Sequence, residues 1–297
     1  VEFWHLAIDK VKDKYPNIIF IAEIYNPGSY SSYINYGHFD YIYDKVGMYD
    51  TLRAVTIGSQ SATAITSCWQ NSGENGEKML HFMENHDEQR IASDFFAGNG
   101  IKGRPAMVVS ACIDKCPIMY YAGQELGEKG MDNEGFSGID GRSTIFDYWA
   151  PDTLSRWYKD GILNDNHLTR EEIDLKAFYS KLFNICCTEQ SISNGLFFDL
   201  MYVNQDSPCF DAHKEYAFLR KQNDEMLLIV ANFADKAQQS QVVIPEHAFS
   251  YLQIGNRGRV NAVELFTGQN VTIDLQPDAP INVQIPANGA IILKCKV

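Results

Sequence analysis

The sequence predicts a chain of two parts: an α/β unit built on a parallel sheet, followed by an antiparallel β-sandwich. Between residues 1 and 192, apolar runs of strand length alternate with segments of helical periodicity. From residue 193 to residue 297, short β-branched or aromatic runs follow one another with turn residues between them. The 297 residues, 45% of them apolar, suffice for two cores, because single cores rarely grow beyond about 250–300 residues.

The first unit opens with a helix and continues as strand–helix pairs. Residues 1–15 place apolar side chains on one face at helical spacing, and Pro16 ends the helix. The run IIFIAEI (18–24) is continuously apolar, which predicts a strand covered on both faces, as in a parallel sheet with outer helices. Three further pairs follow: FDYIYD (39–44) with a helix over 50–69, KMLHFMENHD (78–87) with a helix over 105–114, and PIMYYAG (117–123) with a helix over 175–187.

The last of these helices carries a start signal. Thr169 is followed three residues later by Glu172, which is the spacing of a capping box. A parallel sheet closes as an eight-stranded barrel or is wound on both faces, and four units that begin with an orphan helix complete neither arrangement. We therefore expect that an N-terminal part of the protein precedes this sequence.

The second unit is predicted to be an antiparallel sandwich of about 100 residues, because its apolar runs are short and separated by Asn, Asp, Gly and Pro. The runs are GLFFDLMYV (195–203), EYAFLRKQ (215–222), EMLLIVANF (225–233), SQVVIP (240–245), NVTIDL (270–275), INVQIP (281–286) and AIILKCKV (290–297).

Composition narrows the class of partner. A formal charge of −13 and a pI of 4.9, with no Lys/Arg block, argue against nucleic acid or an anionic membrane surface and favour a neutral substrate. No apolar run reaches the ~18 residues of a membrane span. The seven cysteines do not have the spacing of a zinc site or of a redox motif, so we interpret them as buried thiols or as thiols without a chemical role. The sequence is compatible with a periplasmic or extracellular location of the protein and equally with a cytoplasmic one.

Polar side chains stand at the carboxyl ends of the predicted strands, where α/β barrels carry their active sites. Glu23 closes the first strand, and Asp87 closes the third. Two carboxylates that face each other across a barrel mouth suit glycoside hydrolysis, in which one donates a proton and others meet an oxocarbenium-like transition state. We expect apolar surroundings and a neighbouring carboxylate to keep one of the two protonated near neutral pH.

Each candidate also has a structural interpretation. Glu23 could be a carboxylate held in a salt bridge under a loop. Asp87 could cap the following helix, with Arg90 in a surface ion pair. Glu125, just past the fourth strand, more often ties down a loop than acts in catalysis.

Three of these strands resemble the α-amylase family. FIAEIYNP is similar to the strand that carries the general acid, FMENHDEQR to the F-x-x-N-H-D strand, and PIMYYAGQE to the eighth strand. They occur in the family's order, and the family also appends a β-sandwich after the barrel. The resemblance thus implies the C-terminal half of a (β/α)8 TIM barrel, strands five to eight, over residues 1–192, and a C-terminal β-sandwich over 193–297.

The resemblance also implies roles for individual residues. Glu23 becomes the acid/base, and Asp87 becomes a second carboxylate that hydrogen-bonds the sugar hydroxyls. His86 would donate a hydrogen bond to the same sugar, and Asn85 would bind substrate beside it. Tyr25, close to Glu23, is the aromatic residue that we expect near substrate.

The loop SGIDGRSTIFDYW (137–149) resembles the segment in which an Asp and an Arg hold an outer glucose. Asp140 and Arg142 are therefore substrate-binding candidates, although D-x-R is shorter than the D-P-x-x-R of the family. The family's nucleophile, an Asp in a G-x-R-x-D strand, lies upstream of the segment that matches this chain. The resemblance implies no cofactor within this chain, and it allows a calcium site in the preceding part of the barrel.

The activity implied is retaining hydrolysis of α-1,4-glucosidic bonds in starch-like glucans or maltooligosaccharides, with this chain inactive by itself. One alternative is an α-glucan transglycosylase on the same scaffold. Another is a non-catalytic relative that binds carbohydrate or a partner. Retention of both Glu23 and Asp87 argues against the non-catalytic alternative.

Overall fold

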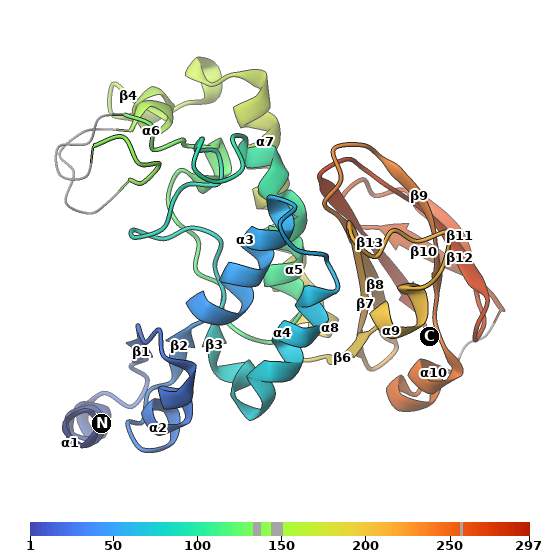
Figure 1. The fold of residues 1–297 in the computed structure, drawn as a ribbon, viewed down its shortest axis with the longest axis horizontal. Helices are drawn as coiled ribbons and strands as arrows, with labels where there is room; N and C mark the ends of the chain where they lie inside the picture. Colours follow the sequence, from blue (N-terminus) through green and yellow to red (C-terminus); the bar gives the residue numbers. More distant parts are fainter. Residues whose placement is uncertain (133–137, 144–150, 256–257) are drawn as a thin grey trace.

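The computed structural model describes residues 1–132, 138–143, 151–255 and 258–297. Figure 1 shows an α/β part, coloured blue to yellow-green, beside a β-rich part coloured yellow to red. The N-terminus lies in the α/β part, at the end remote from the β-rich part. No helix in the described ranges has both the length and the hydropathy that a membrane span requires.

Three short parallel strands form the centre of the α/β part. They are β1 (Ile21–Ala22), β2 (Tyr41–Tyr43) and β3 (Met79–Leu80), in the order β1-β2-β3. The predicted strand over 117–123 is reduced to one parallel bridge, between His81 and Ile118. The parallel arrangement inferred from the alternating pattern is thus confirmed, while the strands are much shorter than their apolar runs.

The predicted helices are present as α1 (Glu2–Lys14), α3 (Asp50–Thr56) with α4 (Ala64–Ser72), α5 (Arg104–Cys112) and α7 (Arg170–Thr188). The structure adds elements that were not predicted: α2 (Tyr30–Asn35), α6 (Asp152–Trp157), α8 (Gln190–Ser193) and a small hairpin of β4 (Tyr158–Lys159) and β5 (Ile162–Leu163). The helix predicted over 50–69 is divided into α3 and α4. Gly58 follows α3 with a φ of 76°, a left-handed conformation that ends helices and that glycine adopts without steric cost.

The expectation that residues 18–24 form a strand buried on both faces is wrong. Only Ala22 is buried, whereas Ile18, Ile19 and Ile21 are 43%, 61% and 46% exposed. β1 is the edge strand of its sheet, and α1 packs through Ile8 on the side that carries Ala22. The apolar run is therefore covered on one face and open on the other.

The β-rich part contains two antiparallel sheets. The larger has the order β11-β10-β13-β8-β7-β6, and β9 pairs with β12 in the smaller. The strands are β6 (Leu196–Asp199), β7 (Glu215–Gln222), β8 (Glu225–Asn232), β9 (Gln238–Val243), β10 (Gly258–Glu264), β11 (Asn270–Leu275), β12 (Pro280–Ile285) and β13 (Gly289–Lys296). The predicted runs supply all of these strands except β10, and the short helices α9 (Met201–Asn204) and α10 (Glu246–Leu252) were not predicted.

The two parts share one hydrophobic core. Every residue of α5 from Pro105 to Cys112 is buried, and the helix packs on β8 and β13 as well as on α3 and α7. Buried side chains of α5, such as Val108, belong to the same cluster as Ile229 of β8 and Ile292 of β13. Because this core is continuous across residues 192 and 193, the division of the chain into two domains stays a prediction.

The helix start signal predicted from the sequence is confirmed at the start of α7. Thr169 and Glu172 form the predicted capping box: the Glu172 N–H donates to Thr169 Oγ1 (3.3 Å) and the Thr169 N–H to Glu172 Oε2 (2.7 Å). Arg156 adds two hydrogen bonds to the Glu172 carboxylate, of 2.9 and 2.5 Å. These bonds, the one from Arg156 foremost, lower the pKa of Glu172.

We expect Glu172→Gln to reduce the free energy of unfolding by about 1–2 kcal/mol at pH 7, from the lost cap and ion pair. A lowered folded-state pKa stabilises the fold above the unfolded pKa of about 4.3 and ceases to do so as the pH falls through the folded value. The difference between wild type and variant should therefore shrink below about pH 4. Urea unfolding at pH 7 and pH 3.5, with Asp174→Asn on the same helix as control, measures it. A difference that does not change with pH would contradict this account.

Candidate active site

The structure brings three of the predicted catalytic and substrate-binding side chains together. Glu23 follows β1, and His86 and Asp87 follow β3, so all three lie at the carboxyl edge of the parallel sheet. One donor atom from each of the three lies within 4.8 Å of the others. His86 Nε2 is 3.5 Å from Asp87 Oδ2. Two carboxylates and an imidazole thus surround one small volume.

Tyr25 belongs to the same group. Its hydroxyl donates a hydrogen bond of 2.6 Å to Glu23 Oε1. Burial raises the pKa of Tyr25, and the hydrogen bond to Glu23 and the negative charges of Asp87 and Glu88 raise it further. Tyr25 is therefore a neutral phenol at physiological pH and acts as a hydrogen-bond donor that fixes one oxygen of Glu23.

The apolar surroundings expected for Glu23 are not present. Glu23 is exposed, as are Ile21 before it and Tyr25 after it. The reason is the position of β1 at the sheet edge, where one side of the strand end meets solvent. The partner of Glu23 is a tyrosine hydroxyl, a neutral donor, and this disfavours the interpretation of Glu23 as a salt-bridged structural carboxylate.

Asn85 lies beneath the site and not in it. Its side chain is buried, and its Oδ1 accepts hydrogen bonds from the backbone N–H of Asp87 (2.9 Å) and of Glu88 (2.8 Å). Its Nδ2 is buried and has no hydrogen-bond partner in the described part of the chain. Asn85 thus shapes the turn that presents Asp87, and the substrate contact expected from the resemblance stays a prediction.

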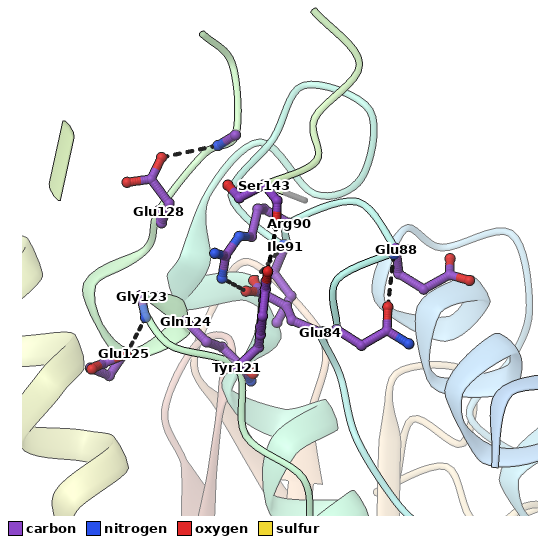
Figure 2. A network of polar contacts seen from close by, with 12 residues as sticks. Glu84, Glu88, Arg90, Ile91, Tyr121, Gly123, Gln124, Glu125, Glu128 and Ser143 are labelled. Carbon is purple, nitrogen blue, oxygen red and sulfur yellow. Dashed lines mark hydrogen bonds and ion pairs between the residues drawn. The ribbon is translucent and has the colours of Figure 1, made fainter. Parts of the chain in front are cut away.

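The helix-cap interpretation of Asp87 does not match the structure. Residues 87–99 form turns and bends, and the next α-helix, α5, begins at Arg104. Arg90, expected in a surface pair, is 2% exposed. Its Nη1 binds Glu84 Oε2 at 2.7 Å, and Glu84 Oε1 accepts the N–H of Ile91 at 2.8 Å (Figure 2).

This buried ion pair fastens the loop that carries His86 and Asp87. Burial raises the pKa of Glu84, while the charge of Arg90 and its hydrogen bond act in the opposite direction. The guanidinium of Arg90 also lies over the ring of Tyr121, 4.2 Å from its centroid. A signal for this pair was present in the sequence, since Glu84 stands at the end of an apolar run, but spacing alone did not connect Glu84 to Arg90.

The loop of Asp140 and Arg142 is anchored to the same network. The backbone N–H of Arg90 donates to Gly141 O at 2.6 Å. The hydroxyl of Tyr121 donates to Ser143 O at 2.5 Å (Figure 2). Arg142 Nη1 binds Asp140 Oδ2 at 2.9 Å, so these two candidates neutralise each other. Their expected binding of an outer sugar stays a prediction, and residues 137 and 144–149 of this loop lie outside the described ranges.

Glu125 takes the loop-tying position that was expected of it. Its Oε2 accepts the N–H of Gly123 at 2.9 Å, two residues earlier. Glu128, further along, accepts the N–H of Thr153 at the start of α6, at 3.1 Å. Both buried carboxylates hold backbone behind the site and leave Glu23 and Asp87 as the exposed pair.

Two residues near the site were not predicted. Burial raises the pKa of Tyr43, and the charges of Glu23 and Asp87 raise it further, which places its hydroxyl within their field. The sequence order contained this information, because β2 lies between β1 and β3 and its end must lie between their ends. Lys45 Nζ is 3.5 Å from Glu88 Oε1 and 2.7 Å from Asp50 Oδ1, so it supplies positive charge at the same edge.

No protein-family model matches the chain, and no curated protein matches it either. Among solved structures, a maltogenic α-amylase from Thermotoga neapolitana is 17% identical with a TM-score of 0.65, and the match covers 99% of this chain and 58% of that one. The α-amylase of Geobacillus thermoleovorans, solved with acarbose, is 16% identical with a TM-score of 0.67, and the shares are 99% and 57%.

A cyclomaltodextrinase is 15% identical with a TM-score of 0.69, and the match covers 99% of this chain and 43% of the cyclomaltodextrinase. The chain therefore spans about half the length of the structures that it matches. At these identities the likeness concerns the fold, and at that level it confirms the resemblance found in the strand-end motifs. The chain has the fold of part of the α-amylase-type glycoside hydrolases.

Proposed function

We propose that this chain is the C-terminal part of a retaining glycoside hydrolase of the α-amylase family that cleaves α-1,4-glucosidic bonds of starch-like glucans or maltooligosaccharides. The observation that carries the proposal is the meeting of Glu23, His86 and Asp87 at the carboxyl edge of the parallel sheet. The fold supports it, and structures of similar fold were solved with acarbose, maltose and maltotriose bound to those proteins.

In this proposal Glu23 is the acid/base. Its carboxylic acid gives a proton to the glycosidic oxygen as the bond to C1 breaks, and the resulting carboxylate later takes a proton from the attacking water. The Tyr25 hydroxyl holds Oε1, so the other oxygen, Oε2, is the atom that faces the leaving group. The hydrogen bond from Tyr25 thus orients the Glu23 carboxyl group, and the acidic proton of Glu23 stays available for transfer to the glycosidic oxygen.

Asp87 and His86 act on the sugar that is cleaved. Asp87 accepts hydrogen bonds from its hydroxyls, and its negative charge favours the positive charge that develops on the ring. His86 donates a hydrogen bond to the same sugar. Asp87 orients its imidazole, because His86 Nε2 lies 3.5 Å from Asp87 Oδ2. Asn85 sets the turn beneath both residues through two backbone hydrogen bonds.

The nucleophile of the proposed enzyme is an Asp on an upstream strand that pairs with the free edge of β1. Such a strand would cover Ile18, Ile19 and Ile21, which are exposed in this structure. It would also supply the shielding of Glu23 that the described residues do not provide. Residues 1–192 would then be the second half of a (β/α)8 barrel, and residues 193–297 a β-sandwich domain.

The proposal is tested by comparing the 297-residue chain with the longer protein that includes the upstream half. We expect the chain alone to release no sugar from maltoheptaose, because it lacks the nucleophile, and the longer protein to release sugars whose anomeric configuration is retained. Proton NMR of the fresh product distinguishes the α-anomer from the β-anomer.

Three results would contradict the proposal: hydrolysis by the chain alone, inversion at the anomeric carbon, or a longer protein that is inert on α-glucans. Products longer than the substrate would favour the alternative, a transglycosylase on the same scaffold. Glucan binding without any turnover by the longer protein would favour the non-catalytic alternative.

A further inference from the structure

A second cluster of metal-ligating side chains lies away from the candidate active site. His5 and Asp9 are four residues apart on α1, and His38 stands in the turn before β2. Because β1 and β2 are parallel, a residue that precedes β2 lies at the opposite end of the sheet from Glu23, which follows β1. Nothing in the proposed hydrolysis uses these three side chains.

The donor atoms of this cluster converge. His38 Nδ1 is 2.6 Å from Asp9 Oδ1, His5 Nε2 is 3.7 Å from Asp9 Oδ2, and the two imidazole rings are 4.3 Å apart between centroids. One donor atom from each residue lies within 4.8 Å of the others. Donors bound to one tetrahedral Zn²⁺ at ~2.0–2.1 Å would be about 3.3 Å apart, so small side-chain rotations would complete the geometry.

The backbone of His38 gives a second, independent observation. Its φ is 63°, in the left-handed region that residues with a Cβ adopt uncommonly. This conformation turns His38 toward α1, where it meets Asp9. A residue kept in this uncommon conformation beside two other potential metal ligands, His5 and Asp9, points to a function at this position.

We propose that His5, Asp9 and His38 form a binding site for one divalent transition-metal ion of the Zn²⁺ type. Two imidazoles and one carboxylate select Zn²⁺, Co²⁺ or Ni²⁺ over Ca²⁺ and Mg²⁺, which prefer sets made of oxygen atoms alone. Three protein ligands leave a position for water. All three side chains are between 40% and 46% exposed, so an ion can enter from solvent.

The electrostatic setting permits a cation. The carboxylate of Asp9 lies between the two imidazoles and supplies a negative charge for the cation. The charge of Lys12 also acts on Asp9, but the Lys12 ammonium is paired with Asp40 at 2.7 Å. A bound ion would connect α1 to the segment that leads into β2, and it would stabilise the fold by the free energy of its binding.

The test is titration of the chelator-treated 297-residue chain with ZnCl₂ by calorimetry, followed by Co²⁺ titration monitored by visible absorption. We expect one site, with Co²⁺ bands of a four- or five-coordinate nitrogen–oxygen complex. His5→Gln and His38→Asn should each weaken binding roughly tenfold or more. Asparagine tolerates the left-handed backbone, so the second variant is expected to fold.

His86→Ala is the matched control, because Glu23, His86 and Asp87 are the other metal-ligating cluster of the described residues. The proposal requires that this variant bind Zn²⁺ as wild type does. It is overturned if His86→Ala abolishes binding, or if His5→Gln and His38→Asn leave the affinity unchanged. A sulfur-to-cobalt charge-transfer band would assign the ion to cysteines and would equally overturn it. Activity on glucans plays no part in these readouts, so the outcome is independent of the proposed function.

Discussion

Glu23→Gln, made in the longer protein that includes the upstream half, is expected to lower kcat on maltoheptaose by roughly 10²- to 10⁴-fold, the range of general acid–base catalysis. Glutamine keeps the shape of the side chain and an oxygen that can accept the Tyr25 hydroxyl, but it has no acidic proton to give. KM should change little, because sugar binding rests on other groups. Initial rates of reducing-sugar release measure both constants.

A substrate that needs no protonation separates catalysis from misfolding. With α-maltosyl fluoride the leaving group departs as an anion, so the bond-breaking step of Glu23→Gln should be much less impaired than with maltoheptaose. Glu88→Gln is the control, since this nearby carboxylate pairs with Lys45 and lies outside the Glu23 cluster. Unchanged turnover of maltoheptaose, or an equal loss of the bond-breaking rate on both substrates in single-turnover measurements, would remove Glu23 from the acid role.

The second large effect concerns stability. Arg90→Met leaves Glu84 buried without its cation, and breaking a buried pair in this way costs about 3–5 kcal/mol. Burial already raises the pKa of Glu84, and loss of Arg90 removes the charge that opposes this rise. A carboxyl whose folded pKa is raised imposes no penalty while it is protonated below the unfolded pKa of about 4.3. The penalty appears as the pH rises through the folded value.

Urea unfolding at pH 4 and pH 8 should therefore show a small loss of stability for Arg90→Met at the lower pH and a large loss at the higher pH. The double variant Glu84→Gln/Arg90→Met should recover much of the loss at pH 8, because no buried charge remains. Asp174→Asn, in an exposed pair with Arg170, should change stability by less than about 1 kcal/mol at either pH. Equal losses for the single and the double variant would show that packing, and not charge, holds this loop.

Local signals predicted the fold well where one segment contains the whole cause. The capping box of Thr169 and Glu172 is an example, because both partners lie within one turn of α7. The parallel arrangement of β1, β2 and β3 followed from alternating apolar runs and helices. The length and burial of β1 could not be predicted in the same way. The same apolar run of residues can form a central strand, with a neighbour on each side, or an edge strand that is open to solvent.

In the candidate site, too, some features could be predicted from the sequence and others depend on tertiary contacts. The strand-end positions of Glu23, His86 and Asp87 placed them together, and the structure agrees with their convergence. The burial of Asn85 depends on which backbone N–H groups its amide reaches, and no spacing rule reveals that. Arg90 was expected at the surface because charged residues usually lie there, whereas Glu84 provides the partner that makes its burial tolerable.

The helix α5 has a consequence for how such a protein can change over time. Its eight residues from Pro105 to Cys112 are all buried, and they fill the space between the α/β part and strands β8 and β13. An exchange of the β-rich part for one from another lineage would have to match this helix side chain by side chain. We therefore expect that a β-rich part taken from a distant relative would leave cavities or overlaps around α5 and would destabilise the fold.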